Sequence, residues 1–66
     1  MIIEVELDKN KKKIELPDGS VVETVLASLD LHPDAFIAIR GGTPIPLTAI
    51  LVDKDKVRLI RVASGG

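Results

Sequence analysis

SVVETVLASLD, residues 20–30, carries the one helix-like periodicity in a chain otherwise made of strand-like runs. Its apolar side chains recur at the i, i+3, i+4 and i+7 positions of a single helix face: Val22, Val25, Leu26 and Leu29. Valine is a weak helix former, so this segment needs a sheet to pack against before it holds a helical conformation. We therefore expect one helix lying on a sheet.

The ends of this helix are also marked in the sequence. Ser20 and Glu23 have the spacing of a capping box, in which each side chain accepts a hydrogen bond from the backbone N–H of the other residue. Pro33 disfavours helical geometry at His32, so the helix is expected to end near Asp30.

Two strand-like runs precede the helix. Residues 2–7 (IIEVEL) and residues 12–16 (KKIEL) alternate between apolar and charged side chains, which is typical of half-buried strands. The polar segment 8–11 between them predicts an antiparallel hairpin, and Pro17-Asp18-Gly19 then ends the sheet. The inward side chains of this hairpin are expected to be Ile3, Val5, Leu7, Ile14 and Leu16.

The chain after the helix contains further short strands. In order, it comprises the strand FIAIR (36–40), a turn at Gly41-Gly42, an edge segment limited by two prolines (43–47), a short apolar run (49–52), a turn (53–56) and the final strand VRLIRV (57–62). Periodicity alone gives an α+β fold. A first and a last strand with one helix between them suit a mixed sheet of four to five strands, with the two terminal strands parallel at its centre. That is the β-grasp arrangement.

Composition limits the classes of function. The 66 residues suffice for a single small domain, and 24 of them are Leu, Ile, Val or Phe, so the chain has enough apolar side chains for a core. Nine basic and ten acidic residues are interspersed, which argues against a nucleic-acid partner. The basic cluster KNKKK (9–13) is interpreted as a solvated turn. No apolar run has the length of a membrane span, and the N-terminus does not resemble a signal peptide, so we expect a cytoplasmic protein.

Catalytic machinery is not recognisable in the sequence. There is no cysteine, and the single histidine, His32, cannot form a two-histidine metal site or a histidine-based catalytic pair. The glycine-rich RGGTP (40–44) lacks the lysine and the following helix of a phosphate-binding loop and is interpreted as a turn. We therefore expect a chain that is not an enzyme and binds neither a cofactor nor a metal.

Four blocks carry a resemblance to a known family: PDGSVVETVLASLDL (17–31), FIAIRGGTPIP (36–46), VDKDKVRLIRV (52–62) and the terminal GG (65–66). Together they resemble the ubiquitin-like sulfur carriers of the ThiS/MoaD family and the related archaeal small modifier proteins (SAMPs). One departure is Asp53-Lys54-Asp55, because such proteins usually have Asp-Gly-Asp there. Lys54 must then adopt a tight turn that glycine adopts more easily.

The resemblance implies a function for the end of the chain. Residues 63–66 would form a flexible tail, and the carboxylate of Gly66 would attack the α-phosphate of ATP inside an E1-like adenylating enzyme, so that ATP is used by the partner. The activated acyl group would then accept sulfur, giving a thiocarboxylate, or a lysine amine of a target protein, giving an isopeptide bond. Gly65 and Gly66 suit a narrow channel because they lack a Cβ. The plain alternative is a frayed chain end.

Docking such a tail requires a surface, which the resemblance places on the solvent-facing side of the sheet. If Val57 and Leu59 point to the helix, and Ile37 and Ile39 to the core, the partner-binding residues are those of the opposite face: Phe36, Ala38, Arg40, Arg58, Ile60 and Val62. Arg61 joins Arg40 and Arg58 as a candidate steering charge. Alternatively, Phe36 and Ile60 fill the rim of a small core.

Two choices stay open at this point. The partners beyond the E1-like enzyme are a sulfur-transfer protein or biosynthetic enzyme in one case, and target-protein lysines in the other. A different class of function is a β-grasp interaction or regulatory module that is never activated, which would account for the fold but not for the two terminal glycines.

Overall fold

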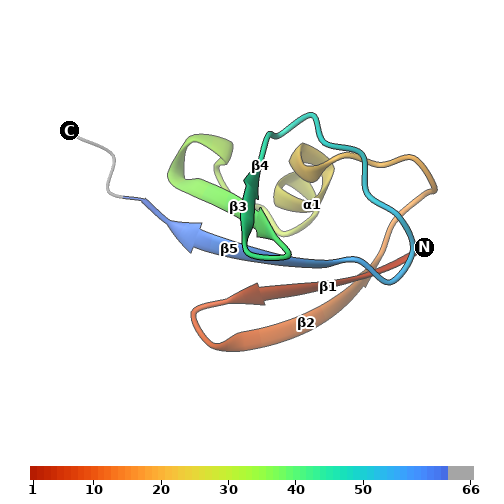
Figure 1. Ribbon diagram of the computed structural model, residues 1–66, viewed down its shortest axis with the longest axis horizontal. Helices are drawn as coiled ribbons and strands as arrows, with labels where there is room; N and C mark the ends of the chain where they lie inside the picture. The colour runs from red at the N-terminus through yellow and green to blue at the C-terminus, as the bar shows by residue number, and fades with distance from the viewer. Residues whose placement is uncertain (63–66) are drawn as a thin grey trace.

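The computed structural model describes residues 1–62 of the chain. Within these residues there are five strands, one α-helix and one short 3-10 helix (Figure 1). In chain order they are β1 (Ile2–Leu7), β2 (Asn10–Glu15), α1 (Val22–Ser28), η1 (Pro33–Ala35), β3 (Phe36–Arg40), β4 (Thr43–Ile45) and β5 (Lys56–Arg61).

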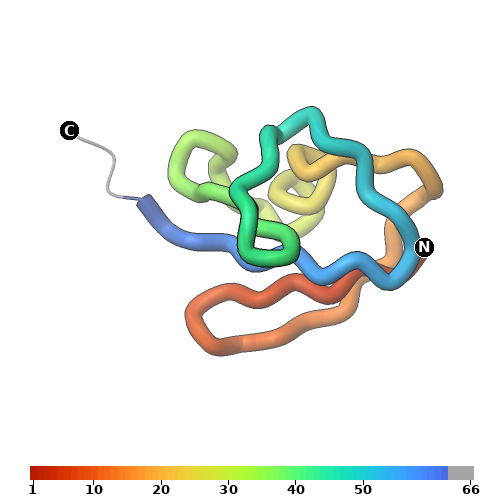
Figure 2. The backbone as a smooth tube through the Cα atoms, viewed as in Figure 1, coloured from red at the N-terminus to blue at the C-terminus, as the bar shows by residue number. Residues whose placement is uncertain are grey.

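The strands form one mixed sheet in the order β2-β1-β5-β3-β4. The two central strands, β1 and β5, run parallel, with Glu4 opposite Lys56 and Leu7 opposite Leu59. The pairs β1–β2 and β3–β4 are antiparallel hairpins on either side of this centre, and β3 also pairs antiparallel with β5. The backbone trace shows the chain returning to the sheet centre in β5 after passing over α1 (Figure 2). The predicted β-grasp fold is confirmed.

The core lies between α1 and one face of the sheet, and Phe36 is its one aromatic residue. Val22, Val25 and Leu26 of α1 are fully buried in it. Burial of such side chains contributes about 1.5–3 kcal/mol each, which exceeds the roughly 0.7 kcal/mol by which a valine disfavours a helix. Packing therefore holds the helix, as its sequence predicts. The other buried residues are Ile3, Val5, Leu16, Ala38, Leu51, Val57 and Leu59.

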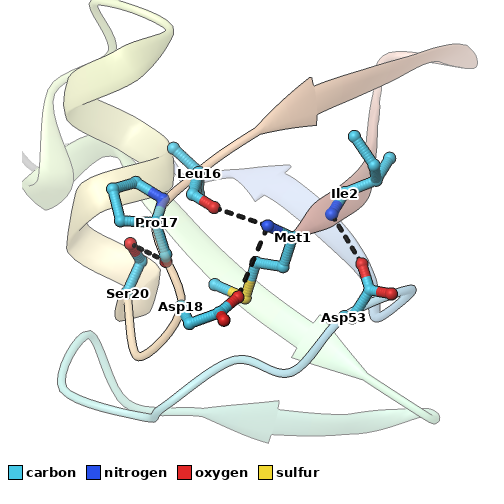
Figure 3. A network of polar contacts seen from close by, with 7 residues as sticks. All are labelled: Met1, Ile2, Leu16, Pro17, Asp18, Ser20 and Asp53. Carbon is cyan, nitrogen blue, oxygen red and sulfur yellow. Dashed lines mark hydrogen bonds and ion pairs between the residues drawn. The ribbon is translucent and has the colours of Figure 1, made fainter.

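The predicted capping box is wrong. The helix begins at Val22, its N-cap is Val21 in an extended conformation, and no side chain caps it. Ser20 Oγ instead donates a hydrogen bond of 2.7 Å to the carbonyl of Pro17 (Figure 3). The end of the helix agrees with prediction, since its C-cap is Leu29 and the expected end was Asp30.

The loop at residues 47–51 replaces the missing cap. The N–H of Val22 donates to the carbonyl of Ala49 (3.1 Å), and the N–H of Glu23 donates to the carbonyl of Leu47 (3.0 Å). These N–H groups of the first turn have no partner inside the helix, so a distant loop satisfies them instead of a local side chain. A sequence pattern reports local caps and cannot show this one.

The first hairpin extends further than expected. Its two-residue loop consists of Asp8 and Lys9, both at positive φ (50° and 69°), which is the backbone of the turn that best fits twisted antiparallel strands. β2 consequently starts at Asn10, two residues before the predicted strand, so of the basic cluster KNKKK (9–13) only Lys9 lies in the turn, while its other residues are exposed on β2. Lysines on an edge strand discourage pairing with another sheet.

The turn Asp53-Lys54-Asp55 fastens the start of β5 to β1. Asp53 Oδ1 accepts a hydrogen bond of 2.7 Å from the N–H of Ile2 (Figure 3), and the N–H of Lys54 donates to the carbonyl of Ile2 at 2.8 Å. The N–H of Glu4 donates to the carbonyl of Asp55 at 2.9 Å. Lys54 lies at a φ of 72°, the conformation in which glycine would be easier to accommodate, as expected from the sequence.

The start of β1 is also held on its other side. The amine of Met1 donates a hydrogen bond of 2.8 Å to the carbonyl of Leu16 and forms an ion pair of 3.5 Å with Asp18 (Figure 3). The N–H of Leu16 donates in return to the carbonyl of Met1 at 2.9 Å. The beginning of β1 is thus fixed between β2 and β5.

We predict that Lys54→Gly raises the free energy of unfolding by about 0.5–1 kcal/mol, because the left-handed conformation costs an L-residue about 1–2 kcal/mol and glycine loses about 0.4–1 kcal/mol more entropy on folding. Lys54→Ala is the matched control, since it removes the charge but keeps the Cβ and should bring no gain. Chemical denaturation of the three proteins measures this. A glycine variant no more stable than the alanine variant would contradict the strain at Lys54.

Candidate partner-binding site

The face of the sheet that points away from α1, hereafter the outer sheet face, is the candidate binding surface. In β5 the side chains alternate as predicted: Val57 and Leu59 are buried in the core, while Arg58 and Ile60 are exposed. Ile60 is 38% exposed, which is high for a large aliphatic side chain in a central strand of a sheet. The position of these two residues suits docking, and their role in binding stays a prediction.

The face expected for β3 is wrong. Phe36 and Ala38, predicted on the docking surface, are only 8% and 3% exposed and belong to the core. Ile37, predicted in the core, is 43% exposed. Pairing with β5 explains this, because Ala38 lies opposite the buried Leu59 and Ile37 lies opposite the exposed Ile60. Directly opposed residues in a sheet share one face.

The sequence of β3 could not identify its inward face. Residues 36–39 are all apolar, so alternation defines two faces without a polar residue to mark the outer one. The charge of Arg40 does not mark the outer face either. Arg40 lies on the same face of β3 as Phe36 and Ala38, but it is the last residue of the strand and lies at the edge of the core.

Arg40 therefore does not belong to the outer sheet face. Its Nη1 donates to Asp55 Oδ2 at 3.1 Å and to the carbonyl of Ile50 at 3.2 Å. Asp55 Oδ2 also accepts a hydrogen bond of 2.9 Å from the N–H of Val52, and the Asp55 side chain is only 17% exposed. Arg40 thus stabilises the loop before β5, and the prediction that it binds a partner loses its structural basis.

An apolar strip runs along the outer sheet face. It crosses β5, β3 and β4, because Ile60 lies opposite Ile37 and Ile39 lies opposite Pro44. Sequence reasoning missed Ile37 and Ile39 as surface residues, although their pairing partners in a β-grasp sheet could have revealed them. We define the apolar strip as Ile37, Ile39, Pro44 and Ile60.

Charged residues border the apolar strip. Arg58 lies opposite Ile39 on β3 and forms an ion pair with Glu6 on β1, with 3.9 Å between Nε and Oε2. A shallow hollow of about 240 Å³ opens beside these residues, and Gly41 and Gly42 contribute to its lining. An apolar centre with a charged rim is the usual composition of a protein–protein interface.

The end of β5 is attached to the rest of the fold. Val62, the last predicted docking residue before the tail, is half-buried, and its N–H donates to the carbonyl of Ala35 at 2.9 Å. The tail predicted at residues 63–66, with Gly65 and Gly66, lies outside the described residues.

Two further observations concern metal binding and membrane insertion. Across residues 1–62, no three His, Asp or Glu side chains gather as they would around a metal ion. Neither helix in this same part of the chain combines the length and the apolar character needed to cross a membrane.

The fold defines the structural class of this protein, because solved structures of ubiquitin-like proteins have the same fold. The ubiquitin of Caldiarchaeum subterraneum superposes with a TM-score of 0.73 at 23% identity, covering 100% of this chain and 98% of that one. SAMP1 from Haloferax volcanii gives a TM-score of 0.76 at 18% identity, with 100% of both chains covered. The N-terminal ubiquitin-like domain of the 4931431F19Rik protein gives 0.77 at 17% identity, covering 100% of this chain and 78% of that one. This is a ubiquitin-like β-grasp protein.

The family follows from the sequence itself. The ThiS family matches residues 3–66, which is nearly the whole chain and includes Gly65 and Gly66. The chain belongs to the ThiS family. A comparison with curated protein sequences finds no match.

We predict that Asp55→Ala lowers the free energy of unfolding by about 1–3 kcal/mol, because the N–H of Val52 and the Arg40 guanidinium lose their shared acceptor. Asp34→Ala is the matched control, since the Asp34 side chain is 90% exposed and has only a 4.0 Å contact with His32. Thermal and urea denaturation measure both variants. Equal stabilities would show that the Arg40 pair contributes nothing to the fold.

The two faces of β5 predict opposite responses to substitution. Leu59→Ala should destabilise the protein by about 2–5 kcal/mol, because it leaves a cavity in the core. Ile60→Glu should cost about 1 kcal/mol or less, because the new charge lies in solvent on the outer sheet face. Circular dichroism during urea unfolding ranks the two variants. An unfolded Ile60→Glu protein would mean that Ile60 is a core residue.

Proposed function

We propose that this chain is a ubiquitin-like sulfur carrier or protein modifier whose Gly66 carboxylate is adenylated by an E1-like enzyme. The observation that carries this proposal is the family match, which extends through Gly65 and Gly66. The chain would be the substrate of the reaction, and the partner would bind the ATP and supply the catalytic groups.

The chemistry needs activation because a carboxylate is a poor acyl donor. A Gly66 carboxylate oxygen attacks the α-phosphorus of ATP and pyrophosphate leaves, which makes AMP the leaving group of the acyl-adenylate. A sulfur nucleophile or a lysine amine then attacks the carbonyl carbon and AMP departs. In the sulfur route, a persulfide forms an acyl disulfide, and a second thiol then attacks its outer sulfur, which forms a disulfide and releases the thiocarboxylate that a biosynthetic enzyme consumes. The amine route ends in an isopeptide bond to a target protein.

The structure supplies a surface that suits such a partner. The apolar strip leaves Ile37 and Ile60 well exposed, and apolar groups clustered on a solvent face are typical of contact sites. The apolar strip includes Ile60 of β5, and Val62, the last described residue, directly follows β5. A partner docked on the strip therefore lies close to the start of the tail. From Val62 to Gly66 an extended chain reaches roughly 13–14 Å, which is enough to enter a buried nucleotide site.

The test is ATP–pyrophosphate exchange catalysed by the E1-like enzyme of the same cell. We predict that deletion of Gly65 and Gly66 abolishes exchange and leaves the melting temperature unchanged, because the new end at Ser64 stops about 7 Å short of the nucleotide. Ile60→Glu should raise the KM for this protein, since it places a charge within the apolar strip. Undiminished exchange by the truncated protein would refute the proposal and favour a module that is never activated.

The two fates of the activated carboxylate are separated by intact mass. Protein isolated from its own cell should gain the mass difference between sulfur and oxygen if it is a sulfur carrier. Diglycine remnants on the lysines of other proteins should appear after proteolysis if it is a modifier.

A further inference from the structure

We propose that Arg61 is a positioning residue that fixes the point from which the C-terminal residues leave the sheet. This inference rests on the proposed function, because the position matters only if Gly66 must reach a partner's nucleotide. Arg61 and Val62 are called the tail root below. The inference comes from the contacts of Arg61, which differ from those of the other arginine on β5, Arg58.

Arg61 joins three parts of the fold. Its Nη2 lies 3.2 Å from Asp8 Oδ2 in the β1–β2 turn, and its Cζ lies 5.4 Å from the centre of the Phe36 ring. Phe36 is the residue opposite Arg61 in the β3–β5 pairing, and it is almost completely buried. The guanidinium therefore lies over a fixed aromatic ring and is held by a carboxylate from the first hairpin.

A hydrogen bond of Val62 acts together with the two contacts of Arg61, to Asp8 and to Phe36. We call these three contacts the clamp. Val62 is beyond the last residue of β5, yet its N–H still donates to the carbonyl of Ala35 at 2.9 Å. This hydrogen bond lies at the end of a ladder, where strands fray most easily. Arg61 is the adjacent residue, so its two contacts protect the bond from fraying.

Asp8 is well placed to hold Arg61. It belongs to a two-residue loop in which Asp8 and Lys9 both have positive φ, so a tight turn fixes its backbone. The Asp8–Arg61 pair is largely exposed, with 60% and 64% of the two side chains accessible. Such a pair contributes little to global stability. Its effect is local, since it holds the tail root, Arg61 and Val62, in place.

Ordering the tail root affects the rate at which the Gly66 carboxylate meets the nucleotide. If Arg61 and Val62 lose these contacts, the number of residues between the last held residue and the end of the chain grows from four to six, and effective concentration falls with the −3/2 power of linker length, by about twofold. The chain would also no longer leave the sheet in a fixed direction, which lowers the rate of adenylation further. We therefore expect kcat/KM for adenylation to fall by about three- to tenfold when the clamp is broken.

A direct contact between Arg61 and the partner would give a different pattern. In that case, Asp8 would compete for the guanidinium, and removing Asp8 would leave adenylation unchanged or make it faster. If Arg61 acts through the clamp, removing either Asp8 or Arg61 slows adenylation. Asp8→Asn is a mild change, because asparagine tolerates the positive φ at this position.

The experiment compares Arg61→Met, Asp8→Asn and the double variant with the wild-type protein in ATP–pyrophosphate exchange. Arg61→Met keeps the apolar stem over Phe36 but removes the charge, and Arg61→Lys should restore part of the rate. Asp18→Asn is the matched control, because Asp18 is an exposed aspartate paired with the amine of Met1. The N-terminus lies at the end of β1 away from the hairpin turn (Figure 1). Amide exchange of Val62, followed by NMR, reports the clamp without any partner.

The expected result is a similar loss in each single variant, no further loss in the double variant, and faster exchange of the Val62 amide with Leu59 unchanged. Normal adenylation by Asp8→Asn, or a Val62 amide as protected as in the wild type, would overturn the proposal. If even the wild-type protein is not adenylated, the proposed function fails, and Val62 amide exchange alone then decides whether the clamp exists.

Discussion

The parallel pairing of β1 with β5 holds the centre of the sheet together. It joins the first and last strands at the centre of the sheet, and the hydrogen bonds of Asp53-Lys54-Asp55 to Ile2 and Glu4 set its register. A strand presents alternate residues to opposite faces, so a slip of one residue would exchange Leu59 and Ile60 between core and solvent. The core, the apolar strip and the direction of β5 all follow from this register.

The single helix shows how strongly local structure relies on these distant contacts. α1 has only seven residues, and a helix of that length is not stable in water by itself. Its apolar face is buried by the sheet, while its first N–H groups bond to the loop at residues 47–51. That loop is held in turn by Arg40 and Asp55. Helix, loop and sheet therefore stabilise one another, which suits a domain too small for a large core.

β5 has three roles within six residues. Its inner side chains, Val57 and Leu59, belong to the core, and its outer side chains, Arg58 and Ile60, form part of the outer sheet face. Its last residue, Arg61, anchors the end of the strand. For the proposed function, a central strand is a suitable support for the chain end, because any surface bound by a partner then has a fixed relation to the last residue of β5.

The fold and the position of the candidate reactive group could be predicted from local patterns in the sequence. The alternation in residues 2–7, the helical stripe from Val22 to Leu29 and the final strand specify a sheet and one helix, because side-chain periodicity is a local property. The same pattern placed Ile60 on the solvent face, and the glycine-rich end was recognised as a family feature.

The buried face of β3 and the start of the helix could not be predicted in this way, because both depend on contacts between distant residues. Residues 36–39 are apolar on both faces, so the pairing of Ala38 with Leu59 fixed the orientation and made Ile37 and Ile39 the surface residues. Arg40 is half-buried because Asp55, fifteen residues away, provides its partner. The helix begins at Val22 because a distant loop, and not Ser20, accepts its first hydrogen bonds. Each of these outcomes depends on residues far apart in the chain, and a local pattern does not contain them.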